Sequence, residues 1–343
     1  MWLRFAKAAR DNINRKNVIA RSSMDLLPSS GPHLHILLNH IPSLGSVLTL
    51  ALYLLAFYKK DERLKHACIM GFLVLALLAI PTYISGAAAR WNIQARSDTD
   101  VLAGLIFAHQ NAAVLAFTAI SVTGCFAWLG LWQQRRFGWV PRWNQFSILG
   151  LGILTVILMI QTGSLGGRIN HPEIRSGVEA VSAPGEPGPI TMAESFITGK
   201  TWAWPAMEAA HFIGLALIFG TVLVLSLRIL GVAKDQVSYA AIHRLLPLGV
   251  AGLIINVVTG MFFFIGDSGR YVATEGFPPK MMLLIIAGFA MIYFTSFDGP
   301  WKLKAKDDAS IFSKAMAVVV LGSWAGVIVF GRLLPYFGVG SGG

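Results

Sequence analysis

The sequence predicts an all-α integral membrane protein with eight transmembrane helices. Of its 343 residues, 55% are hydrophobic and only 13% are charged, and the mean hydropathy is +0.62. A soluble globular domain carries about 25% charged residues, so most of this chain is too apolar to face water. Apolar stretches of about 20 residues, the length needed to cross a bilayer, recur along the chain.

Eight such stretches form two groups of four. The segment between the groups, 164–203, is rich in Gly, Pro and Ser and predicts an extracytoplasmic loop. It separates a first four-helix half, 33–163, from a second four-helix half, 204–343. A basic, amphipathic segment, 1–32, precedes both halves. The predicted spans are 34–58, 66–88, 101–132, 145–164, 204–230, 240–265, 280–297 and 312–334.

The starts of the spans indicate that the two halves are a diverged repeat. Asn39-His-Ile-Pro-Ser-Leu-Gly45 opens the first span, and Ala210-His-Phe-Ile-Gly214 opens the fifth. Lys65-His-Ala-Cys-Ile-Met-Gly71 opens the second span, and Ile242-His-Arg-Leu-Leu-Pro-Leu-Gly249 opens the sixth. Because each copy has four spans, the two copies share one orientation, which makes the repeat a parallel one.

The positive charge indicates an orientation in the membrane rather than nucleic-acid binding. The net charge is +11, but the cations cluster in short loops between apolar stretches, where orientation and anionic lipid explain them. Loops on the side opposite the termini hold 14 Lys and Arg residues, and loops on the terminal side hold eight. Without the six cations of the N-terminal segment, the positive-inside rule places both termini outside the cytoplasm.

Three histidines predict a cofactor site, because an ionisable side chain within a membrane span is costly and usually functional. His40, His109 and His211 are expected roughly 9–12 Å below one surface, from a rise of 1.5 Å per residue. Imidazoles at one depth favour bis-His ligation of a b-type haem between helices. The expected ligands are His40 and His109, with His211 as an alternative ligand or as a donor to one. Ordinary hydrogen bonds between helices are the competing interpretation.

A second haem is the hypothesis for His66 and His243, which occupy corresponding repeat positions near the opposite surface. Both also adjoin basic loops, where an exposed histidine needs no special role. His35 and His40 are five residues apart, about 140° around a helix, so both cannot face one site. For His35, ligation, a hydrogen bond to a haem propionate and solvation all remain open.

Other polar residues refine this picture. Arg90 and Arg244 lie at helix ends where haem propionates would point, and an arginine pairs well with a carboxylate. Contact with lipid headgroups is the alternative for both arginines. Cys68 and Cys125 lie inside apolar stretches and outside any Cys-x-x-Cys-His sequence, so neither anchors a c-type haem. They are expected to be small buried residues.

Each half resembles a different uncharacterised bacterial family of membrane proteins. The first half resembles a small four-helix family with His-x-Pro and late-His motifs, and the second half resembles another four-helix family. The resemblance implies a bacterial membrane topology and a cytochrome-b-like role. Ser226 departs from the second pattern, which has an aspartate before Leu-Arg. The matching motifs are Gly31-Pro-His-Leu-His35, Asn39-His-Ile-Pro42, Ala108-His-Gln-Asn111, His211-Phe-Ile-Gly-Leu-Ala-Leu217, Ser226-Leu-Arg-Ile-Leu-Gly231, Asn256-Val-Val-Thr-Gly260 and Phe277-Pro-Pro-Lys-Met281.

These observations predict a cytochrome-b-like electron-transfer subunit of the bacterial inner membrane, with one or two b-type haems. It is expected to pass electrons between the quinone pool and an extracytoplasmic partner such as a cytochrome c or an iron–sulfur protein. Its expected contacts are membrane lipid and other subunits of a redox complex, with no nucleic acid. Two other classes remain open: a haem-free scaffold or assembly subunit, and a small-solute or metal transporter with a copper or zinc site.

Overall fold

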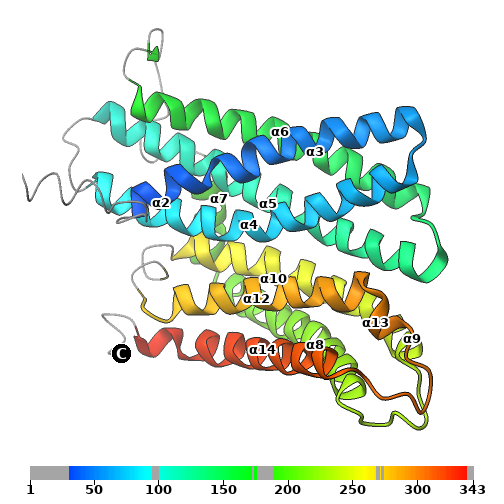
Figure 1. Ribbon diagram of the computed structural model, residues 1–343. Coiled ribbons are helices and arrows are strands. Elements are labelled where there is room, and N and C mark those ends of the chain that lie inside the picture. The colour runs from blue at the N-terminus through cyan, green and yellow to red at the C-terminus, as the bar shows by residue number, and fades with distance from the viewer. Residues whose placement is uncertain are drawn as a thin grey trace, which may run out of the picture.

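The protein is built from long helices arranged side by side. The computed structural model describes residues 31–94, 100–171, 174–175, 188–267, 271 and 274–337. In these residues, eight helical spans are long and apolar enough to cross a membrane, which confirms the predicted fold class. Figure 1 shows one group of helices from the N-terminal half and a second from the C-terminal half, and α2 begins at the end of the bundle where α14 finishes.

Helices of the first half are longer than the spans predicted for them. Its helices α4 and α5 contain 33 and 38 residues, whereas a bilayer needs about 20. Hydropathy locates only the apolar middle of such helices, because their polar ends continue the same backbone hydrogen bonding in water. The helices of this half are α2 (Gly31–Leu38), α3 (His40–Lys59), α4 (Glu62–Gln94), α5 (Asp100–Phe137) and α6 (Arg142–Asn170).

The first predicted span, 34–58, is divided into two helices at Asn39. Pro42 lies in the first turn of α3 and has no backbone N–H, so the carbonyl of Leu38 loses its usual helical donor. The hydroxyl of Thr82 on α4 lies 3.0 Å from the carbonyl of Leu78 and 3.4 Å from that of Leu38, so its one proton is shared between the two acceptors. The proline therefore accounts for the gap in helical hydrogen bonding at this point.

The second half contains a helix within the segment that was predicted as a loop. Gly188 precedes α7, and its backbone N–H donates to the hydroxyl of Thr191, which donates back to the carbonyl of Gly188. Helix α7 contacts α5, α8 and α10. The elements of this half are α7 (Pro189–Gly199), α8 (Ala203–Ile229), α9 (Tyr239–Ile242), the short 3₁₀ helix η2 (His243–Leu245), α10 (Leu246–Gly266), α12 (Phe277–Ser296), α13 (Asp298–Trp301) and α14 (Ile311–Phe337).

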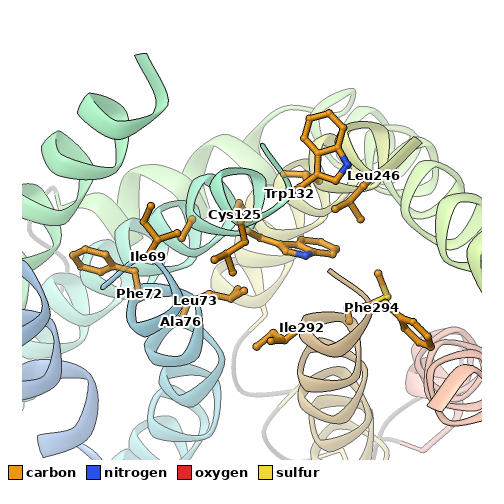
Figure 2. Close-up of a cluster of buried hydrophobic side chains, with 14 of the residues drawn as sticks. Ile69, Phe72, Leu73, Ala76, Cys125, Trp132, Leu246, Ile292 and Phe294 are labelled. Carbon is orange, nitrogen blue, oxygen red and sulfur yellow. The ribbon is translucent and has the colours of Figure 1, made fainter. Parts of the chain in front are cut away.

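One continuous apolar core joins the two halves. Figure 2 shows buried side chains of α4 and α5 meeting those of α10 and α12. Within this core the indole N–H of Trp128 on α5 donates to the hydroxyl of Thr295 on α12 over 2.8 Å. Cys68 and Cys125 are free and buried, as predicted. The outer faces carry exposed apolar side chains such as Leu44 and Ile160, which suit contact with lipid.

A buried arginine fixes the loops at the end of the bundle opposite α2. The side chain of Arg228 at the end of α8 is 1% exposed. Its Nε donates to the carbonyl of Val237 over 2.5 Å, and one terminal nitrogen donates to the carbonyl of Lys304 over 2.8 Å. One guanidinium therefore connects the segments that follow α8 and α13.

Candidate functional site

Two histidines from different helices meet inside the first half. His35 on α2 and His109 on α5 have ring centres 6.4 Å apart, and their planes are inclined by 77°. Helix α4 packs against α2 and α5, and α6 packs against α5. The two imidazoles therefore lie within a four-helix arrangement, near the end of the bundle where α2 begins.

The hydrogen bonds of this pair fix which ring nitrogen carries the proton. The Nδ1 atom of His35 lies 3.0 Å from the carbonyl oxygen of Thr82, and that of His109 lies 2.9 Å from the carbonyl oxygen of Thr162. A carbonyl oxygen can only accept, so each Nδ1 must donate a proton. In a neutral imidazole the Nε2 atom is then unprotonated, which is the form that binds a metal ion.

A glycine faces each imidazole at the same spacing from the accepting threonine. A Cβ atom added to Gly86 would lie 2.7 Å from Cε1 of His35, and one added to Gly166 would lie 3.1 Å from Cε1 of His109. Each glycine is four residues after the threonine whose carbonyl holds the imidazole. A side chain from a neighbouring helix reaches a helical carbonyl most easily when the residue four positions later is a glycine, because no side chain then covers that carbonyl. The repeated Thr-x-x-x-Gly pattern thus seats both rings against the helix backbone.

The spacing of the two rings suits bis-imidazole ligation of one iron. A metal–nitrogen bond of about 2.0 Å and a ring radius of about 1.15 Å give facing ring centres roughly 6.3 Å apart. The observed separation of the ring centres in their edge contact, 6.4 Å, is close to this value. Structural zinc sites use four protein ligands and catalytic ones use three. Among the described residues, no group of three or more His, Cys, Asp or Glu side chains gathers at one point.

Arg90 on α4 lies beside this pair. Its guanidinium donates to the side-chain oxygen of Gln110, the residue after His109, over 2.7 Å. Glu194 on α7 is also close enough to interact electrostatically with Arg90. A half-buried guanidinium at this position can pair with the carboxylates of an anionic ligand. Arg244 is exposed on η2 in the second half.

The ring of His109 contacts that of His35, whereas the expected ligand pair was His40 and His109. The His40 side chain is exposed, and its Nδ1 lies 3.1 Å from the carbonyl of Ile36 in the preceding turn. His40 was expected to be a ligand only because of its depth in the bilayer. Both α2 and α3 pack against α4, and His35 on α2 is the histidine whose ring contacts that of His109.

His211 lies in the second half, apart from the pair. Its Nδ1 is 2.8 Å from the hydroxyl of Thr259 on α10, and its ring centre is 5.5 Å from that of Phe263. In the part of the chain that is described, it makes no ring contact with His35 or His109. Equal depth in the bilayer did not bring the third imidazole to the others.

The histidines near the opposite surface do not form a second pair. His66 is half-buried near the start of α4, and His243 is fully buried on η2. The ring of His243 packs 4.4 Å from that of Trp301 and 5.4 Å from that of Tyr239. Among the described residues, His66 and His243 make no ring contact with each other. A second haem therefore has no facing imidazoles in this part of the protein.

Sequence reasoning missed the groups that hold the imidazoles of His35 and His109. These groups are the backbone carbonyls of Thr82 and Thr162 and the glycines at 86 and 166. The repeated Thr-x-x-x-Gly spacing was the available signal. Comparisons of the chain with models of known families, with curated proteins and with solved structures found no match.

Proposed function

We propose that the protein is a cytochrome-b-like electron-transfer subunit, in which His35 and His109 are the axial ligands of one b-type haem. The observation that carries this proposal is the pair of imidazoles in edge contact, each with its Nδ1 held by a backbone carbonyl. Such outer hydrogen bonds fix ring orientation and raise the basicity of the ligating nitrogen. When bound, haem supplies reversible one-electron chemistry.

The chain itself supplies the ligands, a counter-charge and an apolar setting. The unprotonated Nε2 atoms are available to iron, and Arg90 is placed to receive a carboxylate. The long apolar helices exclude water, and this low polarity is one factor that tunes the redox potential of a haem. Because the site uses only two side-chain ligands, it suits a macrocycle that provides the remaining ligands.

The position of the pair bears on the route of electrons. It lies at the end of the bundle where α2 begins, and the loops at the other end are richer in Lys and Arg. Under the positive-inside rule the pair lies on the extracytoplasmic side of a bacterial inner membrane. The proposed electron route runs from the quinone pool to an extracytoplasmic partner, such as a cytochrome c or an iron–sulfur protein within a membrane complex.

The direct test is the reduced-minus-oxidised absorption spectrum of the protein purified in detergent. Wild-type protein should show b-type bands, and both His35→Ala and His109→Ala should abolish them. His40→Ala is the matched control, because its side chain is exposed at the same end of the bundle. It should leave the bands unchanged.

The same samples distinguish the competing functions. Wild-type protein that folds but takes up no haem would refute the proposal and favour a scaffold or assembly subunit. Copper or zinc at about one ion per chain, without haem, would instead favour a metal transporter. Bands that survive in His109→Ala and disappear in His40→Ala would contradict the assignment of the ligands.

A further inference from the structure

The second half contains another histidine whose protonation is fixed. The hydroxyl of Thr259 donates to the carbonyl of Ile255 over 2.7 Å, so its oxygen accepts from Nδ1 of His211. The Nε2 atom of His211 is therefore an unprotonated acceptor in the neutral ring. It has no hydrogen-bond partner among the described residues.

A lysine lies near this histidine within a membrane span. Lys280 is in the first turn of α12 and is close enough to His211 to interact electrostatically. A Cβ atom added to Gly331 on α14 would lie 3.4 Å from Nζ of Lys280, which places the ammonium between these helices. Within the described ranges, Lys280 forms no ion pair. An ammonium group within a membrane span needs a hydrogen-bond acceptor in place of the water it has lost.

The surroundings suit a flat apolar ligand that enters from the lipid. Phe263 contacts His211, and its ring centre is 5.0 Å from that of Trp204. Phe212 and Ile213, which follow His211 on α8, are exposed on the lipid-facing surface. The site thus combines one donor, one acceptor and aromatic surface at a place that the bilayer can reach.

Aromatic side chains also connect this region with the histidine pair. Phe264, next to Phe263 on α10, has its ring centre 5.5 Å from that of Tyr83 on α4. Tyr83 stacks on Phe117 at 4.8 Å and directly follows Thr82, whose carbonyl holds His35. Ring contacts therefore cross the interface between the halves where Phe264 meets Tyr83.

We propose that His211, Thr259 and Lys280 form a binding site for the head group of a quinone or hydroquinone. Lys280 donates to one ring oxygen, and Nε2 of His211 accepts from the hydroxyl of the reduced form. The isoprenoid tail remains in the bilayer beside α8. This inference rests on the proposed electron-transfer function, since it names the redox substrate that would exchange electrons with the histidine pair.

The first test measures binding and does not depend on haem. Decylubiquinone is titrated into the purified full-length protein by calorimetry, with oleate as a second probe because a carboxylate would also satisfy Lys280. Decylubiquinol, the reduced form, is titrated in the same way. Lys280→Met should weaken decylubiquinone binding and His211→Phe should weaken decylubiquinol binding, each about tenfold or more, as expected for loss of a buried polar contact. The matched controls are His40→Phe and Lys200→Met, whose side chains are exposed.

The second test follows reduction of the protein's chromophore by decylubiquinol in a stopped-flow instrument. In His211→Phe and Lys280→Met the rate should fall at least tenfold, while the dithionite-reduced spectrum stays unchanged. Absence of a haem spectrum in wild type would refute the proposed function alone, since quinone binding is measured independently. Wild-type affinity for decylubiquinone in Lys280→Met, together with wild-type affinity for decylubiquinol in His211→Phe, would overturn the quinone site. Tight binding of oleate without quinone binding would overturn it equally.

Discussion

Adding one methyl group at Gly86 should displace the ring of His35, the proposed haem ligand, without changing any polar group. The new Cβ would lie 2.7 Å from Cε1 and 3.0 Å from Nδ1 of that ring. Carbon atoms in contact prefer separations of about 3.5–4.0 Å, so the ring must move by roughly 0.8–1.3 Å. Such a shift would lengthen the 3.0 Å bond to the carbonyl of Thr82 beyond hydrogen-bonding distance.

The expected cost of Gly86→Ala is a 10- to 100-fold loss of haem affinity, the range seen when outer-shell support of a metal ligand is removed. The assay is haemin titration of the haem-depleted protein, followed by absorption. Gly163→Ala is the matched control, because Gly163 is also helical but a Cβ there meets no atom within 4 Å. Wild-type affinity in Gly86→Ala, or an equal loss in Gly163→Ala, would refute the reasoning.

Three further substitutions test the scaffold by thermal unfolding in detergent. Trp128→Phe removes the hydrogen bond between α5 and α12 and should lower the free energy of unfolding by about 1 kcal/mol. Arg228→Met removes a buried donor to several carbonyls and should lower the free energy of unfolding by at least about 3 kcal/mol. The control Arg332→Met, at an exposed side chain, should leave it nearly unchanged. Equal melting temperatures of the two variants would contradict this prediction. The hydrogen bond from Lys314 lowers the pKa of Asp308 in the folded protein below its ordinary value of 3.8. The ionised carboxylate therefore stabilises the fold at pH values above 3.8. This stabilisation is lost as the pH falls through the lowered pKa of the folded protein. Asp308→Asn should therefore lower the melting temperature slightly at pH 7 and leave it unchanged at pH 2.

The sequence was sufficient to predict the membrane spans because hydrophobicity and length constrain them directly. It also singled out His109, whose apolar surroundings make an imidazole conspicuous. It did not predict which ring would contact His109, because depth in the bilayer leaves the helix face undetermined. His35 is held by the carbonyl of Thr82, which lies 47 positions away in the sequence on α4.

Other features could not be derived from local patterns. Helix α7 occupies part of a segment rich in Gly and Pro, and its contacts with α5, α8 and α10 are long-range. The matched repeat positions of His66 and His243 suggested a shared site, but η2 buries His243 among aromatic rings instead. By contrast, the Thr-x-x-x-Gly spacing on α4 and α6 was visible in the sequence. Its meaning required knowing that an imidazole lies over each glycine.

The most direct test of bis-imidazole ligation is the electron paramagnetic resonance spectrum of the oxidised, purified protein. Wild-type protein should give a low-spin ferric signal. In His35→Gly and His109→Gly the signal should become high-spin or disappear, and added imidazole should restore the low-spin form. A low-spin signal that persists in both variants, or wild-type protein without any haem iron, would contradict the account.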